Sequence, residues 1–243
     1  MKVLVTGHKG FIGSYVYHHL KYNAGYGELV EGLDFPDDIG DFQGPEGMFA
    51  QHYDIVIHLA AFAALRDSIE NPEKFWENNV EKSKPIFDYC RKNNVRLLYA
   101  SSAGAHGWWM NPYAITKKVN EVQAPPNSVG MRFFNVWAEE DSRPDMLYRM
   151  LQENTATYIT RHLRDYIHVK DVARAICYLI PSTFTGPIDI GTGQSTSVLE
   201  LAKAMGRDLP IKEDTPGEPD SLCANTTALC ELGWFPTINI MDQ

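Results

Sequence analysis

The chain has 243 residues, of which 44% are hydrophobic, which suits one large α/β domain, alone or with a small appendage, and excludes a disordered protein. Its net charge of −9 argues against non-specific nucleic-acid binding, which needs a basic face, although a few local arginines would suffice for a phosphorylated small substrate. The N-terminus enters a strand at once and no apolar run approaches the ~18 residues of a membrane span, so we expect a cytoplasmic protein that does not bind a membrane.

The chain opens with a strand, a glycine-rich turn and a helix. Residues 2–6 are an apolar run that predicts a buried parallel strand. Gly7, Gly10 and Gly13 follow, and they suit a tight turn, close approach of backbone to a pyrophosphate, and close packing of helix on strand. A helical pattern then begins, with apolar residues at every fourth position (Ile12, Val16 and Leu20). The helix N-terminus offers unpaired N–H groups to phosphates, so this context favours a dinucleotide site over a plain tight turn.

A second strand ends at Asp34, which lies 21 positions after Gly13. A carboxylate there can accept hydrogen bonds from both ribose hydroxyls of NAD, and it repels the 2′-phosphate of NADP. A solvated strand-end aspartate is the alternative, because Asp37 and Asp38 lie nearby, and Lys9 in the glycine turn would partly offset the repulsion. The residue favours NAD.

Strands and helices then alternate along the chain. Residues 40–42 fit the remnant of a short third strand, and residues 45–51 leave room for a brief helix. Residues 53–61 predict a strand that ends in small side chains, which let a ligand lie against backbone or simply pack tightly. Asn71 and Pro72 predict a helix start. A core-facing stripe follows on that helix (Trp76, Val80, Ser83, Phe87 and Cys90).

The next strand, over residues 95–100, ends at Ser101 and Ser102. A second Asn-Pro start at Asn111 opens another helix, and residues 129–134 form a further strand. This alternation predicts a parallel, doubly wound sheet with right-handed crossovers.

Beyond this strand the pattern loosens. Three helices are predicted: one from Asp171 with Val172, Ala175, Ile176 and Leu179 inward, one behind a capping box of Ser197 and Glu200, and one over 225–232 closed by Gly233. Residues 213–220 are rich in Pro, Gly and acidic residues and predict a surface loop that could fold over a ligand. The four cysteines show no metal-ligand spacing, so we expect reduced thiols and no metal site.

Tyr113 and Lys117 lie four residues apart, on one face of the predicted helix. An ammonium near the phenol would favour the phenolate, and lowering the pKa of a tyrosine by ~3 units needs about 4 kcal/mol, which one charge at ~4 Å can supply. A packed tyrosine with a lysine that extends to solvent explains the pair better when it is taken alone. Ser102 and the glycine turn belong at the same edge of the sheet, where ligands bind in such folds, so the three features together favour an enzyme.

Together these motifs resemble the extended short-chain dehydrogenases/reductases, in particular the NAD-dependent nucleotide-sugar epimerase/dehydratase group. The resemblance covers nearly the whole chain. It is carried by Gly7, Gly10, Gly13, Asp34, residues 54–61, Asn79, residues 101–103, Pro112, Tyr113, Lys117 and residues 132–135, 164–169, 191–193, 216–219 and 232–234.

The resemblance implies a Rossmann sheet of about six or seven parallel strands with a small C-terminal α/β substrate lobe. It places the NAD-binding domain at residues 1–135, with about 165–192 returning to it, and the substrate lobe largely at residues 136–243. It also implies a homodimer in which the helices over 72–90 and 112–122 pair.

The resemblance assigns roles to individual residues. Tyr113 would be the catalytic acid/base, Lys117 its electrostatic partner and ribose anchor, and Ser102 a ligand of a substrate hydroxyl. Asn135 and Arg164 match positions that hold the phosphates of a nucleotide-sugar substrate. The implied NAD contacts are Gly7, Gly10, Phe11, Ile12, Gly13, Asp34, Asp41, Phe42, Leu59, Ala60, Ala61, Asn79, Ser101, Tyr113, Lys117 and Phe133, with Asp41 and Phe42 bordering the adenine.

The chain departs from the family pattern in several places. It is shorter than most members, and the stretches over 107–113 and 135–164 are compressed. His106 stands where the family usually has another aromatic residue, and Thr215 stands where an arginine often precedes the Pro-Gly-Glu turn. His106 is either a participant in proton transfer or, more commonly for a lone histidine by a turn, a structural residue.

These features predict an NAD-dependent nucleotide-sugar epimerase that acts at C4 through a transient ketone. A dehydratase of the same family would be expected to carry an acidic pair after Ser102, where Ala103 and Gly104 stand, and a reductase would prefer the NADPH that Asp34 disfavours. A non-catalytic dinucleotide-binding sensor would fit the shortened lobe, but it would not need Tyr113, Lys117 and Ser102.

Overall fold

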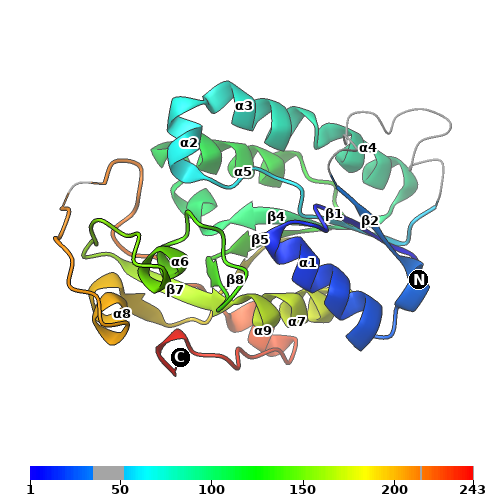
Figure 1. The fold of residues 1–243 in the computed structure, drawn as a ribbon. Helices are drawn as coiled ribbons and strands as arrows, with labels where there is room; N and C mark the ends of the chain where they lie inside the picture. The colour runs from blue at the N-terminus through cyan, green and yellow to red at the C-terminus, as the bar shows by residue number, and fades with distance from the viewer. Residues whose placement is uncertain (35–51, 214, 243) are drawn as a thin grey trace.

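The computed structural model describes residues 1–34, 52–213 and 215–242 (Figure 1). The predicted third strand over 40–42, the helix over 45–51, and the adenine contacts Asp41 and Phe42 lie outside the described residues. No helix among the described residues is long and apolar enough to cross a membrane. All four cysteines are free thiols, as their spacing predicts.

A parallel sheet forms the centre of the molecule. In the described chain it has six strands in the order β2-β1-β3-β4-β5-β8, and every neighbouring pair is parallel. The strands are β1 (Val3–Thr6), β2 (Val30–Leu33), β3 (Ile55–His58), β4 (Arg96–Ser102), β5 (Ser128–Phe133) and β8 (Gly186–Ile190). The chain crosses from β1 to β2 on one side and returns to β3 on the other, so the glycine turn lies where the strand order reverses. The predicted doubly wound α/β fold is confirmed.

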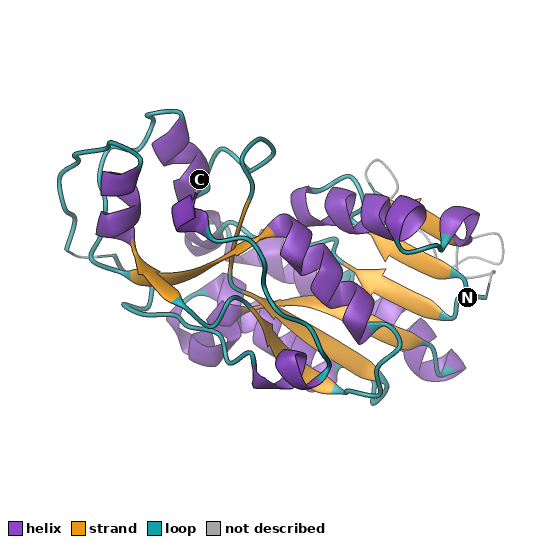
Figure 2. Cartoon of the chain, turned by 90° about the horizontal axis from the view of Figure 1, so that it is seen from below, coloured by secondary structure: helices purple, strands orange, loops and turns teal. Residues whose placement is uncertain are grey.

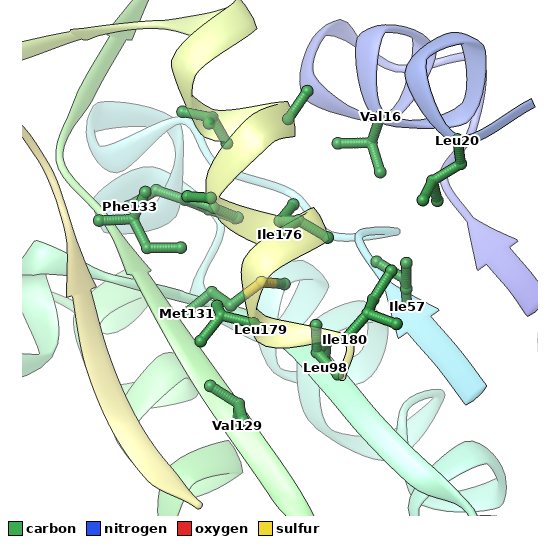
Figure 3. Close-up of a cluster of buried hydrophobic side chains, with 14 of the residues drawn as sticks. Val16, Leu20, Ile57, Leu98, Val129, Met131, Phe133, Ile176, Leu179 and Ile180 are labelled. Carbon is green, nitrogen blue, oxygen red and sulfur yellow. The ribbon is translucent and has the colours of Figure 1, made fainter. Parts of the chain in front are cut away.

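Helices cover both faces of this sheet (Figure 1). On one face lie α2 (Leu65–Glu70), α3 (Pro72–Trp76), α4 (Lys84–Asn93) and α5 (Pro112–Gln123), and on the other α1 (Phe11–His18), α7 (Val169–Leu179) and α9 (Thr227–Glu231). Because both faces are covered, β1 and β3 are buried along their whole length and do not alternate. Figure 3 shows the larger core, where Val16 of α1 and Ile176 of α7 face Ile57, Leu98 and Met131 of the sheet.

A second, smaller sheet lies beyond the carboxyl end of β5 (Figure 2). It contains β6 (Asn135–Trp137), β7 (Leu163–His168) and β9 (Ser195–Ser197), and α6 (Leu147–Gln152) and α8 (Val198–Ala204) lie beside it. The Asp165 carboxylate on β7 accepts hydrogen bonds from the backbone N–H groups of Thr192 (2.7 Å) and Gly193 (2.8 Å), just after β8. This carboxylate therefore ties the small sheet to the large one. Short π- and 3₁₀-helical segments complete the described chain: η1 (His19–Asn23), η2 (Gly27–Leu29), η5 (Glu77–Glu81), η6 (Ala103–Met110) and η7 (Ile240–Asp242).

The stripe predicted after Pro72 is wrong at Trp76, which is 42% exposed while Phe75 is fully buried. A π-helical turn, η5, follows α3, and its five-residue spacing places Phe75 and Val80 on the same inward face. The indole N–H of Trp76 donates to Glu81 at the surface instead. Asn71 precedes the helix as predicted, but its side chain donates to Asp67 and does not cap.

Two further helix starts differ from the prediction. Helix α7 begins at Val169, ahead of Asp171, and the His168 side chain caps it by accepting from the Lys170 N–H. The Asp171 carboxylate instead accepts from the backbone N–H groups of Thr237 and Ile238, so it fixes the C-terminal segment. Ser197 is the N-cap residue of α8, but its hydroxyl makes no capping bond to a described residue. The capping box is therefore wrong, although the helix it predicted is present.

Candidate active site

The glycine turn between β1 and α1 is closed too tightly for side chains at two of its positions. Gly7 has φ +73°, and a Cβ there would lie 2.6 Å from the Ala60 nitrogen. A Cβ on Gly13 would lie 1.9 Å from the Gly7 oxygen, so α1 packs directly on the turn. A Cβ on Gly10 meets only the Gly7 oxygen at 3.2 Å, and no described side chain caps the helix N-terminus that begins there. Because the N–H groups of Gly7, Lys9 and Gly10 donate within the protein, the uncapped N–H groups at the start of α1 are those left for a ligand, and with the closed turn they form a cradle of the kind that binds a pyrophosphate.

Asp34 lies directly after β2, beside this cradle. Its carboxylate accepts a hydrogen bond from the Lys9 N–H at 2.6 Å. The interaction holds the glycine turn against the end of β2 and fixes a negative charge at the edge of the cradle. An acceptor in this place suits the ribose hydroxyls of a dinucleotide.

The predicted contacts beside this cradle come from the ends of β3, β4 and β5 and the start of α1. Leu59, Ala60 and Ala61 follow β3, and Ala60 donates its N–H to the Thr6 hydroxyl at 3.4 Å. Ser101 on β4 donates to Glu121, and Phe133 ends β5. Phe11 and Ile12 open α1 and pack against the large core. All of these predicted cofactor contacts therefore gather at one sheet edge.

Asn79 differs from the other predicted cofactor contacts because it is buried and bonded to protein. Its side-chain oxygen, Oδ1, accepts from the Phe62 N–H (2.8 Å). Its side-chain amide donates to the Phe62 carbonyl (3.0 Å) and to the Thr116 hydroxyl (3.2 Å). Its side chain thus fixes the segment after β3, which supports the cleft from behind.

The three predicted catalytic residues lie together. Asn111 caps α5 by accepting from the Ala114 N–H at 2.8 Å, which sets Tyr113 in the first turn. The Lys117 ammonium is buried, lies 5.6 Å from the centroid of the Tyr113 ring, and donates to the Ala100 carbonyl at 3.1 Å. The Ser102 oxygen accepts from the Gly104 N–H at 3.1 Å, and its side chain acts to lower the pKa of the Tyr113 phenol.

Burial dominates the electrostatics of this trio. It raises the pKa of Tyr113 above its ordinary value, and the hydrogen bond from Ser102 and the charge of Arg143 only partly oppose it. Burial also lowers the pKa of Lys117 to about 7. In the protein by itself the Lys117 ammonium is directed at the Ala100 carbonyl, and the pKa of Tyr113 stays above its ordinary value because burial dominates.

Arg143 is a residue that sequence reasoning missed. It lies between β6 and α6, and its Nη2 pairs with Asp145 at 3.1 Å while its buried Nε has no hydrogen-bond partner among the described residues. Asp141, two residues earlier, accepts from the Tyr15 hydroxyl of α1 at 2.8 Å, so this segment reaches across to the cofactor helix. No periodicity or spacing in the sequence marks an isolated arginine in a compressed loop.

His106 is held by a hydrogen bond to a carboxylate. Its Nε2 lies 2.9 Å from the buried Asp189 carboxylate at the end of β8, and Arg132 lies 3.4 Å from both of its ring nitrogens. Arg132 in turn makes a bidentate pair with Glu121 of α5 (2.7 and 2.8 Å). These contacts fix η6, the segment between Ser102 and Tyr113, and they favour the structural interpretation of His106.

The two predicted phosphate ligands lie in the small sheet. Asn135 opens β6 and pairs in register with Tyr166 of β7. Arg164 on β7 is buried, and its Nη2 lies 2.6 Å from His162 Nδ1 and 3.6 Å from the Glu218 carboxylate. Glu218 also pairs with Arg66 of α2 at 3.2 Å. Residues 215–220 therefore reach these two arginines, and the Glu218 carboxylate already pairs with Arg164.

No group of three or more His, Cys, Asp or Glu side chains in the described chain could hold a metal ion. The residues at the sheet edge instead fit a dinucleotide, because they combine an N–H cradle that leaves no room for side chains with a carboxylate at the end of β2.

Comparison with known proteins gives consistent matches along the chain. The sequence profile of the NAD dependent epimerase/dehydratase family matches residues 3–191. UDP-glucose 4-epimerase of Pisum sativum is 26% identical over 96% of this chain and 90% of its own length. That alignment extends over 316 positions, more than the 243 residues of this chain, so the relative carries insertions that this chain lacks.

Solved structures share the fold. UDP-glucose 4-epimerase from Thermotoga maritima, determined with UDP-glucose, superposes with a TM-score of 0.82 at 24% identity, covering 100% of this chain and 96% of that one. UDP-glucuronic acid 4-epimerase from Bacillus cereus, in complex with UDP-glucuronic acid and NAD, gives a TM-score of 0.85 at 21% identity and covers 100% and 96% of the two chains.

Proposed function

This chain belongs to the NAD dependent epimerase/dehydratase family, and we propose that it epimerises a nucleotide sugar at C4 through a transient ketone. The observation that carries the proposal is the assembly of Ser102, Tyr113 and Lys117 at the sheet edge that also holds the glycine cradle. The relatives support the chemistry, because the matched plant enzyme and two structural neighbours are nucleotide-sugar 4-epimerases.

NAD is the cofactor, and when bound it would supply the acceptor and donor of a hydride. The backbone of Gly7, Gly10 and Gly13 would hold its pyrophosphate, and the Asp34 carboxylate would accept from its ribose hydroxyls. The remaining predicted contacts would line the cleft between these two points and Lys117.

Tyr113 would take the proton from the sugar hydroxyl and return one after the ketone has turned in the pocket. Ser102, whose side chain acts to lower the pKa of the phenol, would hold the substrate oxygen beside it. Lys117, whose pKa is about 7, would carry positive charge for part of the enzyme near neutrality and stabilise the phenolate. Arg143 adds a second positive field at the phenol.

The small sheet would receive the nucleotide diphosphate. Residues 136–243 largely make up this lobe, whereas residues 1–135 and about 165–192 hold the cofactor in the proposed division. Arg164 would bind the phosphates together with Asn135, and Glu218 would have to release Arg164 to allow it. Binding of the dianion would replace one carboxylate by a stronger partner of the same arginine.

We also propose a cytoplasmic homodimer. An apolar cavity of about 350 Å³ lies on the outer face of α5, lined by Trp108, Ile115, Val119 and Val122. This face belongs to the helices that would pair, so light scattering of the purified protein should give the mass of a dimer. A monomer at micromolar concentration would remove this part of the proposal.

A ligand screen followed by product analysis tests the function. UDP-, GDP-, dTDP- and CDP-sugars are added with NAD, and a ligand that binds the native state alone should raise the melting temperature. Nucleotide sugars that stabilise the protein are then incubated with it, and the expected result is a C4 epimer. Binding without any new product would favour a sensor, and a product that has lost water would favour a dehydratase.

A further inference from the structure

A buried histidine that this chemistry does not use lies at the end of β3. His58 is 4% exposed, and both of its ring nitrogens meet hydroxyl groups. Its Nδ1 lies 2.7 Å from Thr6 Oγ1, and its Nε2 lies 2.9 Å from Ser83 Oγ. Thr6 is the residue before Gly7 of the cofactor turn, whereas Ser83 lies just before α4 on the opposite side of the imidazole.

The neighbouring bonds fix the direction of these two interactions. The Ser83 hydroxyl donates to the Asn79 carbonyl at 2.8 Å, so its oxygen is left to accept the Nε2–H of His58. A neutral imidazole that donates from Nε2 must accept at Nδ1, so the Thr6 hydroxyl donates there. The Thr6 oxygen in turn receives the Ala60 N–H at 3.4 Å. One tautomer of neutral His58 satisfies every bond.

The surroundings also disfavour a charge on this ring. Burial lowers the pKa of His58 to about 3, and the Lys117 ammonium acts in the same direction. The Phe87 ring packs edge-on against the imidazole with centroids 6.2 Å apart.

The bonds continue from Ser83 to the catalytic helix. The backbone carbonyl of Asn79, which accepts from the Ser83 hydroxyl, also accepts from the side-chain amide of Asn120 on α5 at 2.8 Å. The Asn79 amide donates to the Thr116 hydroxyl, which donates to the Tyr113 carbonyl at 2.7 Å. A chain of hydrogen bonds that passes through the backbone and side chain of Asn79 therefore connects the residue before Gly7 with the first turn of α5.

We propose that His58 is a positioning residue: through this directed chain of hydrogen bonds it couples the cofactor turn to the helix that carries Tyr113 and Lys117. A neutral imidazole is essential to the role, because a second proton would leave Thr6 facing a donor and would put a positive charge beside Lys117. The coupling to catalysis rests on the proposed function, whereas the tautomer and the effect on NAD affinity do not.

The first test is the ¹⁵N spectrum of the imidazole in the full-length protein between pH 5 and 8. The expected result is a proton on Nε2 alone, with chemical shifts that do not change over this range. A ring protonated on Nδ1, or one that titrates in this range, would overturn the proposal whatever reaction the protein catalyses.

The second test is a double-mutant cycle with His58→Phe, which keeps a ring, and Ser83→Ala, read by NAD titration and by kcat. Each change should weaken NAD binding about fivefold and lower kcat about tenfold, and the double variant should lose no more than His58→Phe does. Ser128→Ala, which also removes a buried serine hydroxyl, serves as the control and should change neither quantity more than twofold. If the losses of NAD affinity in the two single variants add fully in the double variant, or if Ser83→Ala leaves the NAD affinity unchanged, the coupling is contradicted.

The NAD affinities can follow the expected pattern while no turnover of a nucleotide sugar is found. In that case the proposed function fails and the coupling to the cofactor turn does not.

Discussion

The cofactor edge of the large sheet and the arginine site of the small sheet are built in different ways. At the cofactor edge the turn is closed by backbone: a Cβ on Gly7 would meet the backbone of Ala60, and a Cβ on Gly13 would meet that of Gly7, so neither position has room for a side chain. Arg164 is held by polar and charged groups instead: the nearby His162 and, farther along the chain, Glu218 and the Asp220 carbonyl. The first site is therefore set by backbone geometry, and the second by a balance of charges.

This difference predicts different responses to substitution. A site fixed by backbone loses one chemical function when one side chain is removed and keeps the remainder of its structure. At a site balanced by charges, the affinity for a charged ligand can fall or rise, depending on whether a positive or a negative side chain is removed.

The largest effect is expected for Tyr113→Phe, which removes the proposed proton acceptor and leaves the cradle intact. Turnover of a verified nucleotide sugar should fall by about 10²–10⁴-fold, because general acid–base catalysis typically contributes that much. NAD affinity should stay within about threefold of wild type, since the pyrophosphate contacts are backbone groups. Turnover within tenfold of wild type would show that Tyr113 is not the acid/base.

Arg164→Ala should come next, with a substrate KM raised by roughly 10–100-fold, because a hydrogen bond to a charged group contributes about 1.5–3 kcal/mol. NAD affinity should be nearly unchanged, since Arg164 lies in the small sheet. An unchanged KM, measured with the same sugar, would make Arg164 a structural partner of Glu218 only.

Asp34→Ala tests the cofactor edge itself. It removes both an acceptor for ribose hydroxyls and a charge that repels a 2′-phosphate, so NAD binding should weaken about tenfold and its advantage over NADP should narrow. Fluorescence titration with each dinucleotide measures both quantities. A wild-type protein that already prefers NADP would contradict the role proposed for Asp34.

Glu218→Gln should give the smallest effect, and it should strengthen the binding of a nucleoside diphosphate where Arg164→Ala weakens it. Removing the carboxylate frees Arg164 and Arg66 from a competing partner, so the affinity for a nucleoside diphosphate should rise by a few fold. Glu213→Gln is the matched control, because Glu213 pairs with Arg161 at the exposed surface and should change little. Weaker binding in Glu218→Gln would show that this carboxylate contacts the substrate and does not compete with it.

The sequence could predict the parts of the molecule that depend on short-range geometry. The strands, the glycine turn and the Asn111 cap follow from neighbouring residues, and the four-residue spacing places Tyr113 and Lys117 on one face. The prediction failed at Trp76, because a π-helical turn is not visible in a pattern that assumes regular α-helical spacing.

Long-range charge pairing was beyond the sequence. Glu218 reaches Arg66 across 152 positions and His106 reaches Asp189 across 83, and no periodic pattern relates such residues. The same limit applies to the pKa of Tyr113, since the depth of burial that raises it is a property of the assembled site.

The fate of the hydrogen on the reacting carbon tests the epimerase most directly. A nucleotide sugar deuterated at C4 is incubated with the enzyme, catalytic NAD and an excess of unlabelled NADH. In an epimerase the hydrogen removed from the carbon returns to it within the same pocket, so the account predicts a C4 epimer that keeps its deuterium, with no net accumulation of NADH. Loss of the label to the pool, or stoichiometric consumption of NADH or NADPH, would contradict it and identify a reductase.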